Sequence, residues 1–263
     1  MKAVFELQNA TFEYGRVNAL RNVSMKLEAG DRVALLGSNG SGKSTLLRVL
    51  DALLPLSAGK ILFDGVEITE DLLSTDEFVL LFRRRVALLF QDPDVQLFNP
   101  TVFDELAFGP LQLRWPRGRI EQCVLKMLER MEISHLRDRA PHRLSGGEKK
   151  RAALASILVL DPEVLLLDEP TAALDPRSQS QFVDFIRNLD PGRTVVTATH
   201  DLDTVEDIAN YCYVLSAGSI IAKGTPGEIL ADTRLLESVN LIHSHHHTGV
   251  PEPHYHPHRH DQR

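Results

Sequence analysis

A glycine-rich stretch, GSNGSGKS, lies between the apolar run RVALL and the segment TLLRVLDALL, whose apolar residues have helical spacing. Glycines let the backbone turn so that successive N–H groups face one anion, and the first turn of the following helix favours the same negative charge. The pattern G-x-x-x-x-G-K-[ST] between a strand and a helix therefore predicts a loop that binds nucleotide phosphates. We expect Lys43 to contact the β- and γ-phosphates and the Ser44 hydroxyl to bind Mg²⁺. The residues assigned to this loop are Gly37, Ser38, Asn39, Gly40, Ser41, Gly42, Lys43, Ser44 and Thr45.

A second candidate for chemistry is the acidic pair that ends the run VLLLDE. An unbroken apolar run is typical of a strand buried on both faces of a parallel sheet, and ligands bind at the carboxyl ends of such strands. We expect Asp168 to bind Mg²⁺ and Glu169 to be the catalytic group that polarises the attacking water. A solvated acidic turn after an isolated strand is common, but beside a phosphate-binding loop the pair indicates hydrolysis.

The periodicity of the chain predicts the elements that position these groups. Residues 1–30 alternate and turn as β-strands do, and unbroken apolar or β-branched runs predict strands in RVALL, VLLLDE and TVVTATH. We expect RRRVALLFQ to be another strand, YCYVLSAGSIIAKG a hairpin and GEILADTRLLESVNL one amphipathic helix, while helical patterns prevail over about residues 101–160. The chain is expected to be an α/β protein with an N-terminal β part and an inserted helical part.

The composition narrows the class of protein. The chain is 43% hydrophobic and 25% charged, with a net charge of −7, which is typical of a globular protein and argues against a general nucleic-acid surface. No run reaches the roughly 18 apolar residues of a membrane span, and the first residues show no secretion signal. The two cysteines, Cys123 and Cys212, form no metal or redox motif, and we expect buried, reduced thiols.

The stretch LSGGEKKRAALA distinguishes among the many classes of protein that use a phosphate-binding loop. A serine hydroxyl and two glycine N–H groups at the start of a helix form a second anion cradle. Placed between the glycine loop and VLLLDE, this stretch resembles the signature of the ATP-binding subunits of ABC transporters, and the resemblance covers about residues 1–240. In that family the cradle binds the γ-phosphate of ATP held by the other subunit. The matching residues are Ser145, Gly146, Gly147 and Glu148.

Four further positions match the family in order along the chain. Tyr14 matches the aromatic residue that stacks on adenine, and Gln91 matches the glutamine that senses Mg²⁺ and the membrane partner. Ala172–Asp175 matches the loop that crosses the dimer seam, with Ala173 at a position where glycine is often expected. His200 matches the catalytic switch histidine that contacts the γ-phosphate.

The resemblance implies an ABC ATPase of the P-loop α/β fold, with the ATPase domain at residues 1–240, its helical subdomain at about 92–160, and a His-rich flexible tail at 241–263. It implies hydrolysis of ATP to ADP and phosphate with Mg²⁺, and two composite sites in a dimer. The dimer is either two copies of this chain or this chain with a related subunit. The implied partners are integral membrane transporter subunits, which places the protein peripherally at the cytoplasmic face of the membrane.

The segment QDPDVQLFNPTVFDELAFGP indicates a branch of the family. It resembles the coupling segment of energy-coupling factor transporters, in which P-D-x-Q-L-F follows the sensing glutamine and forms the groove that grips the membrane partner. The resemblance implies that Asp94, Gln96 and Phe98 belong to a docking surface. Four carboxylates are available to receive arginines from the partner: Asp92, Asp94, Asp104 and Glu105.

The C-terminal residues are rich in histidine but interrupted by other residue types, unlike a cloning tag. Three prolines predict neither a regular helix nor a central strand there. Alternate positions of an extended chain share a face about 6.6 Å apart, so neighbouring imidazoles can bind one metal ion such as Ni²⁺ or Co²⁺. The candidate ligands are His254, His256, His258 and His260.

Together with the coupling-factor resemblance, the tail favours an ATPase subunit of a nickel or cobalt importer. Three alternatives remain open. One keeps the ATPase role and changes the cargo to a vitamin or another small solute. Another is a non-transport ABC protein, although such chains usually carry two cassettes or long coiled-coil insertions. The third is a metal chaperone or storage protein with an idle nucleotide site. For the tail itself, a solvated polar segment without function is the alternative to metal binding.

Overall fold

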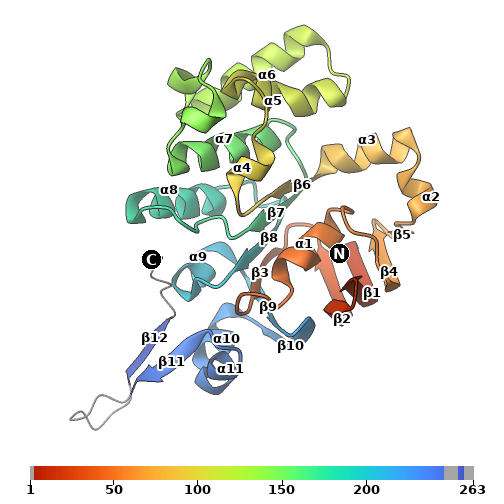
Figure 1. Cartoon of the computed structure of the whole chain (residues 1–263), viewed down its shortest axis with the longest axis vertical. Coiled ribbons are helices and arrows are strands. Elements are labelled where there is room, and N and C mark those ends of the chain that lie inside the picture. Colours follow the sequence, from red (N-terminus) through yellow and green to blue (C-terminus); the bar gives the residue numbers. More distant parts are fainter. Residues whose placement is uncertain (1–2, 246–253, 258–263) are drawn as a thin grey trace. The chain divides into compact units, whose positions relative to one another are not determined.

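The computed structural model describes residues 3–245 and 254–257, and the chain divides into two compact units (Figure 1). The first unit comprises Met1–Glu67 and Val196–Arg263, and the second comprises Ile68–Val195. The later boundary falls within strand β8 (Thr194–Thr199), which therefore begins in the second unit and ends in the first. In sequence, the second unit is an insertion into the first.

The N-terminal sheet of the first unit is antiparallel throughout. Its strands are β1 (Ala3–Tyr14), β2 (Val17–Glu28), β4 (Ala58–Phe63) and β5 (Val66–Glu67), in the order β2-β1-β4-β5. A tight turn at Gly15, with φ 61°, joins β1 to β2. The buried rings of Phe5 and Phe63 lie 5.0 Å apart on neighbouring strands. This sheet confirms the strands predicted for the first 30 residues.

The other sheet of the first unit carries the glycine loop. Its strands are β3 (Arg32–Leu36), β9 (Tyr211–Ser216) and β10 (Ser219–Gly224) together with β8, in the order β10-β9-β3-β8. Strands β3 and β9 are parallel, with Ala34 opposite Cys212, whereas β9 and β10 form the predicted antiparallel hairpin. Nearly every residue of β3 and all of β8 are buried, which explains the apolar run of β3 and the apolar and β-branched residues of β8.

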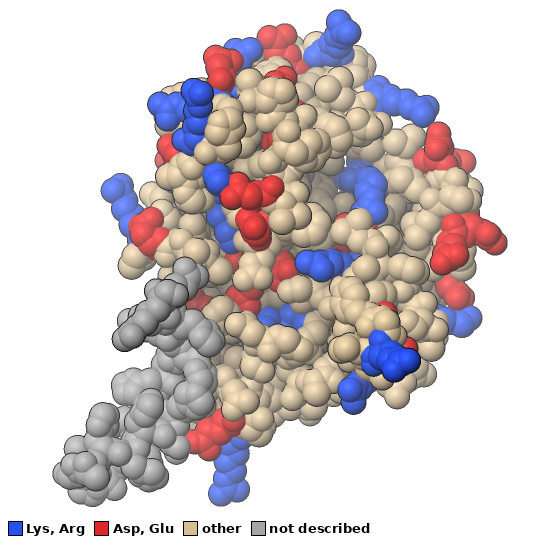
Figure 2. Space-filling view, in the orientation of Figure 1, with Lys and Arg blue, Asp and Glu red and all other residues tan. Residues whose placement is uncertain are grey.

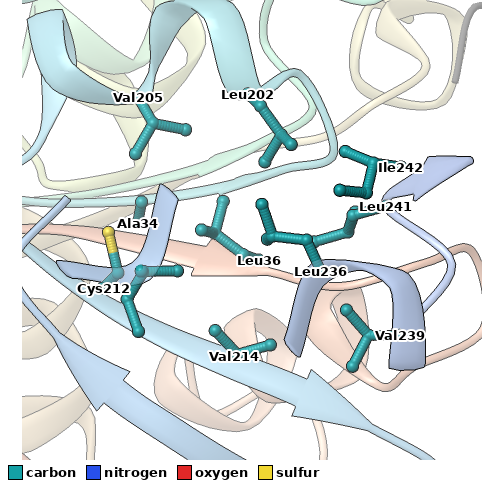
Figure 3. Close-up of a cluster of buried hydrophobic side chains, with 11 residues drawn as sticks. Ala34, Leu36, Leu202, Val205, Cys212, Val214, Leu236, Val239, Leu241 and Ile242 are labelled. Atoms are coloured by element: carbon teal, nitrogen blue, oxygen red, sulfur yellow. The ribbon is translucent and has the colours of Figure 1, made fainter. Parts of the chain in front are cut away.

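A buried apolar cluster packs around β3 and β9 (Figure 3). Besides these strands it draws on η3 (Leu202–Thr204), α9 (Val205–Ile208), α10 (Pro226–Ala231), α11 (Thr233–Ser238) and β11 (Ile242–His245). Its members are Ala34, Leu36, Leu202, Val205, Cys212, Val214, Ile229, Leu236, Val239, Leu241 and Ile242. Because Leu36 directly precedes the first glycine of the loop, the cluster fixes the strand from which the loop departs.

The C-terminal amphipathic segment forms two short helices, α10 and α11, and the prediction of one helix is wrong. At Asp232 the backbone leaves the helical region, with ψ 80°. The Asp232 carboxylate accepts a hydrogen bond from the Leu235 N–H at 3.0 Å and so begins α11. Aspartate favours such caps over helix interiors, because its side chain competes for backbone groups.

The second unit contains the parallel strands β6 (Val86–Leu89) and β7 (Val164–Asp168), with Leu89 opposite Leu167. The strand predicted from RRRVALLFQ begins only at Val86, because its three arginines form the last turn of a helix. The helices of this unit are α2 (Glu70–Leu73), α3 (Asp76–Arg85), α4 (Pro93–Gln96), α5 (Val102–Gln112), α6 (Arg117–Arg130), η1 (Ser134–Leu136), η2 (Pro141–Arg143), α7 (Gly146–Leu158) and α8 (Pro176–Arg187). Helices α2 and α3 were not predicted, although Thr69 caps the first and acidic residues open both.

Beyond α11, strands β11 and β12 (His254–Pro257) form a two-stranded antiparallel sheet. Both strands of such a sheet are edges, and Pro257 is the last residue of β12, which is a position that proline tolerates. The expectation of neither helix nor central strand is consistent with this arrangement. Among the described residues, no helix is long and apolar enough to cross a membrane.

Candidate nucleotide-binding and hydrolysis site

The predicted phosphate-binding loop lies between β3 and helix α1 (Lys43–Leu50) in the first unit. All three of its glycines, Gly37, Gly40 and Gly42, have positive φ. A Cβ atom on Gly37 would lie 2.4 Å from the Leu215 carbonyl oxygen, and one on Gly42 would lie 2.7 Å from the Ala19 carbonyl oxygen. No side chain caps α1. The loop therefore needs glycine for its course and leaves the start of the helix to an anion.

Two polar side chains lie buried inside the loop. The Lys43 ammonium donates hydrogen bonds to the carbonyl oxygens of Gly37 at 2.7 Å and Ser38 at 3.2 Å. The Ser41 hydroxyl is buried and has no hydrogen-bond partner among the described residues. A buried cation and a buried hydroxyl around a glycine cradle fit a phosphate group, which carries negative charge and acceptor oxygens.

The turn between β9 and β10 is hydrogen-bonded to the phosphate-binding loop, a role that the sequence did not predict. The Gly218 N–H donates to the Ser41 carbonyl oxygen at 3.0 Å, and the Gly218 carbonyl oxygen accepts from the Arg21 N–H at 2.8 Å. A Cβ atom at Gly218 would lie 2.8 Å from the Ala19 carbonyl oxygen. The dipeptide Ala-Gly at a hairpin was a turn signal, but nothing in it indicated this neighbour.

The first unit also holds Tyr14 and His200. Tyr14 ends β1 with nearly half of its side chain exposed, and its ring lies edge-on to Phe12 with centroids 4.7 Å apart. The exposed ring is available for stacking on a base. His200 directly follows β8 and is half-buried.

In the second unit, the acidic pair and the glutamine follow two paired strands. Asp168 ends β7 and Glu169 comes next with φ 45°, and both are buried. Gln91 lies two residues beyond the end of β6 and is exposed. Because β6 and β7 are parallel, their carboxyl ends meet at one edge of the pair. This edge therefore gathers hard oxygen donors, which are the ligands that suit Mg²⁺.

Lys150 is a buried cation at the same edge that sequence reasoning missed. Its ammonium donates to the carbonyl oxygen of Glu169 at 2.9 Å. Burial lowers the pKa of Lys150 to about 8, and the nearby carboxylates Glu169, Asp168 and Asp92 oppose that shift. The signal was present, because helical spacing places this lysine on the same face of α7 as the fully buried Ala153 and Leu154.

The signature residues form the start of α7. The Ser145 hydroxyl accepts from the Glu148 N–H at 3.4 Å, and the Glu148 carboxylate accepts from the Ser145 N–H at 2.8 Å. This capping box lowers the pKa of Glu148, chiefly through the hydrogen bond from the Ser145 backbone. A Cβ atom at Gly146 would meet nothing within 4 Å. The chain itself thus gives no steric reason for this glycine, whereas close approach of an outside ligand would.

The loop before α8 is shaped by two residues of the predicted dimer-seam motif. Ala173 has φ 61°, the left-handed conformation that explains why glycine is expected there. The Asp175 carboxylate caps α8 by accepting from the N–H groups of Arg177 and Ser178, both at 3.1 Å. Hydrogen bonds from Ser178 hold the pKa of Asp175 below its usual value. Asp175 therefore acts within this chain as a helix cap.

Two residues expected on the docking surface are turned inward instead. The Gln96 amide donates to the Ala153 carbonyl oxygen at 3.1 Å and to the Ser156 hydroxyl at 3.2 Å, which ties α4 to α7. Glu105 is buried, and one carboxylate oxygen accepts from the N–H groups of Phe98 at 3.0 Å and Asn99 at 2.6 Å. Gln96 is half-buried, and its place on a docking surface stays a prediction. The expectation that Glu105 receives an arginine is wrong, because its buried carboxylate stabilises its own segment.

The other carboxylates of this segment are exposed. Asp92 caps α4, and Asp94 forms an ion pair with Lys149 at 2.6 Å. The same segment carries four exposed apolar side chains, called the apolar patch below, and among them the rings of Phe98 and Phe108 pack edge-to-face 5.0 Å apart. The patch and its exposed fractions are Val95 at 68%, Phe98 at 66%, Phe108 at 38% and Leu111 at 52%.

The predicted tail ligands fall into two groups. His254 and His256 belong to β12, whereas His258 and His260 lie outside the described residues. Among the side chains that the structure describes, no group of three or more His, Cys, Asp or Glu residues could hold a metal ion.

The surface charge is mixed. On the face shown in Figure 2, the described basic and acidic side chains are interspersed, and no continuous basic surface is visible there.

Comparison with known proteins identifies a family and individual relatives. The family model described as ABC transporter matches residues 20–172. The chain is 51% identical over 246 residues to the nickel import ATP-binding protein NikO of Rhodobacter capsulatus, covering 92% of this chain and 97% of that protein. It is 41% identical over 240 residues to the energy-coupling factor transporter ATP-binding protein EcfA of Methanothermobacter thermautotrophicus, covering 90% and 76%.

A solved structure shows the same fold. The structure of cbiO1 from Clostridium perfringens, part of the ABC transporter complex cbiONQ, matches with a TM-score of 0.76 at 35% identity, covering 92% of this chain and 96% of that one. The predicted fold class and the predicted ATPase class are confirmed. With its glycine loop, acidic strand end and signature helix, the chain belongs to the ATPases of the ABC transporter family.

Proposed function

We propose that this ATPase energises the import of Ni²⁺ or Co²⁺ by an energy-coupling factor transporter. The observation that carries the proposal is its similarity to a nickel import ATP-binding protein, which extends over 92% of this chain. The similarity to an energy-coupling factor ATPase, over 90% of the chain, supports the branch. The His-rich tail supports a metal cargo, because imidazole is a ligand of both ions.

In the proposed reaction, the chain binds and orients ATP and one water molecule. Lys43 exchanges its two carbonyl acceptors for phosphate oxygens, and the buried Ser41 hydroxyl gains an acceptor. As the family resemblance implies, Ser44, Gln91 and Asp168 would hold Mg²⁺, which would neutralise charge on the phosphates. Glu169 accepts a hydrogen bond from the attacking water, and Lys150 holds the Glu169 main chain in place. His200 contacts the γ-phosphate and Tyr14 stacks on adenine.

The active unit is a dimer with two composite sites, formed either by two copies of this chain or by this chain and a related subunit. The start of α7 supports this arrangement, since Gly146 leaves open space where a Cβ atom would otherwise stand. In the proposed dimer, Ser145, Gly146 and Gly147 contact the γ-phosphate bound by the other subunit. ATP shared between both halves drives closure because it binds the closed state more tightly.

The membrane partner docks on the apolar patch of Val95, Phe98, Phe108 and Leu111. Two adjoining aromatic rings with this exposure are typical of a binding surface, and the neighbouring Asp92 and Asp104 can pair with basic residues of the partner. The proposed location is accordingly the cytoplasmic face of the membrane.

Uptake of radioactive Ni²⁺ or Co²⁺ into cells that produce the native complex tests the cargo. Glu169→Gln should bind ATP, stall hydrolysis and abolish uptake, and Lys43→Ala should abolish tight ATP binding. Glu121→Gln, a change at an exposed position of α6, is the matched control and should leave uptake unchanged.

Mass spectrometry of the partners that co-purify in mild detergent identifies the transporter. Partners that bind Ni²⁺ or Co²⁺ are expected. Vitamin-binding partners, with vitamin uptake that depends on Glu169, would overturn the metal cargo and leave the ATPase role intact. Normal hydrolysis by Glu169→Gln would instead remove this residue from its proposed role.

A further inference from the structure

The second unit carries an open groove of about 650 Å³. Its walls come from the C-terminal half of α3, the segment between α5 and α6, and the residues just before β7. None of its lining residues belongs to the motifs that resemble those of ABC ATPases. The volume falls within the range of about 300–1,000 Å³ that is typical of ligand sites. The groove is therefore large enough for a ligand and is not accounted for by the nucleotide site.

One side of the groove is apolar and partly open to solvent. Leu80, Leu113 and Trp115 are half-buried there, and Leu81 is 47% exposed. Trp115 is the only tryptophan of the chain. Because the indole ring combines a large apolar surface with one N–H donor, tryptophan favours boundaries between apolar and aqueous surroundings.

The charges in the lining pair with one another except for one cation. Glu163 forms an ion pair with Arg85 at 2.6 Å, and Asp161 forms one with Arg193 at 2.5 Å. Arg84 is exposed and has no ion-pair partner among the residues that the structure describes. The groove therefore presents an apolar wall and an uncompensated positive charge, which together suit an anionic ligand with an apolar part.

Two further arginines extend the positive charge beside Trp115. The Arg119 guanidinium lies 3.8 Å from the centre of the Trp115 ring, a stacking that orients its planar group while the edge can still donate hydrogen bonds. Arg117 is exposed, and within the described part of the chain neither arginine pairs with a carboxylate. Both stand in the first turn of α6, which contains no acidic residue although the helix dipole favours anions there. A bound anion would offset this crowding of positive charge.

We propose that this groove, with Arg84, Trp115, Arg117 and Arg119 at its rim, binds anionic phospholipid at the membrane surface. The arginines contact lipid phosphates, while Trp115 and Leu81 lie against the upper part of the acyl chains. The choice of a membrane as the source of the anion rests on the proposed function, which places the protein at the cytoplasmic face. Because the net charge of the chain is −7, these local cations decide which side of the protein approaches an anionic membrane.

The test is binding of the full-length protein to vesicles of equal parts phosphatidylcholine and phosphatidylglycerol, compared with vesicles of phosphatidylcholine alone. Flotation measures binding, and fluorescence of Trp115 reports contact at the groove because no other tryptophan contributes. Binding to the anionic vesicles only is expected, with emission shifted to shorter wavelength and quenched by lipids brominated on the acyl chains. Added salt should weaken the binding, because it screens exposed charges.

Two double variants assign the binding to the groove. Arg84→Gln/Arg119→Gln should weaken binding to the anionic vesicles by at least about tenfold, as expected for loss of two cations at an anionic surface. Arg139→Gln/Arg143→Gln is the matched control, because it removes the same charge from exposed positions outside the groove. This control should change the affinity by less than about threefold.

Three outcomes would overturn the proposal. Equal weakening by both double variants would show attraction by net charge alone. Binding without a change in Trp115 emission would assign the contact to another surface. If the anionic vesicles do not bind while soluble polyglutamate shifts the Trp115 emission, the groove would belong to an acidic protein partner instead.

The vesicle assay uses no transporter partner, so its result is separate from that of the proposed function. A native complex that imports neither Ni²⁺ nor Co²⁺ would overturn the proposed cargo, and vesicle binding through Arg84 and Arg119 would still stand. Normal metal uptake by a protein that binds no anionic vesicles would overturn only the lipid site.

Discussion

Glu105 is predicted to stabilise the apolar patch proposed as the docking surface rather than to contact a partner. One oxygen atom of its buried carboxylate accepts hydrogen bonds from the backbone N–H groups of Phe98 and Asn99. Phe98 is also the most exposed aromatic residue of the patch. Replacement of Glu105 should therefore loosen the presentation of Phe98 even though the carboxylate itself never reaches the surface.

The expected magnitude follows from these two hydrogen bonds. Glu105→Ala leaves two N–H groups without their acceptor, which destabilises the fold by about 1–3 kcal/mol for each group. Part of this loss is offset because the variant no longer buries a carboxylate. A net loss of about 2–4 kcal/mol in the free energy of unfolding is expected. Glu105→Gln keeps one carbonyl oxygen in reach of both donors and should lose about 1–2 kcal/mol, because only the charge-assisted part disappears.

Urea unfolding measures both variants against Glu121→Ala, which removes an exposed carboxylate of α6 and should change stability by less than about 0.5 kcal/mol. Capture of the membrane partner should fall in the order wild type, Glu105→Gln, Glu105→Ala, with nucleotide affinity unchanged. If Glu105→Ala unfolds at the same urea concentration as the control, the structural role assigned to this carboxylate is refuted.

Three other changes probe the nucleotide site and the apolar cluster around β3 and β9. Lys150→Met should cut phosphate release at least about tenfold while ATP affinity stays within threefold, because the Glu169 carbonyl loses its donor; unchanged turnover would contradict this role. Gly42→Ala should lower the thermal midpoint by an amount equivalent to about 2–4 kcal/mol, since φ is 108° and the new Cβ would meet a carbonyl oxygen at 2.7 Å. Burial raises the pKa of Cys212 to about 12 from its usual 9.0, so the stability gained by keeping it neutral is full below pH 9 and lost as the pH rises toward 12. The free energy of unfolding of Cys212→Ala should therefore fall less than that of the wild type between pH 9 and pH 12. In the wild type, a thiol reagent should modify the more exposed Cys123 before Cys212.

The motifs that bind small, fixed chemical groups were readable from the sequence. A phosphate needs closely spaced N–H groups and a cation, so Gly37 to Ser44 had to be local in the chain, and the strand ending in Asp168 showed its burial by composition. The same logic explains the position of Ala173, where the expectation of glycine corresponds to a φ of 61°. A group that is formed within one short segment can therefore be predicted from a short sequence pattern.

What could not be predicted depends on tertiary neighbours. Glu105 and Gln96 read as surface residues because their type is usually solvated, yet each satisfies backbone or side-chain groups of a neighbouring segment. Lys150 shows the same limitation, since only packing of α7 decides that this cation is buried.

The interrupted first unit has a consequence for synthesis of the chain. Strand β3 pairs with β9, and Arg32 is joined to Asn210 across 178 residues of sequence. At ribosomal rates of about 5–20 residues per second, the β3 edge that later pairs with β9 waits for roughly 10–35 seconds after it emerges. During that interval the apolar edge of β3 is open to wrong partners. The yield of active enzyme therefore depends on how well chaperones, or early folding of the N-terminal sheet, protect this edge.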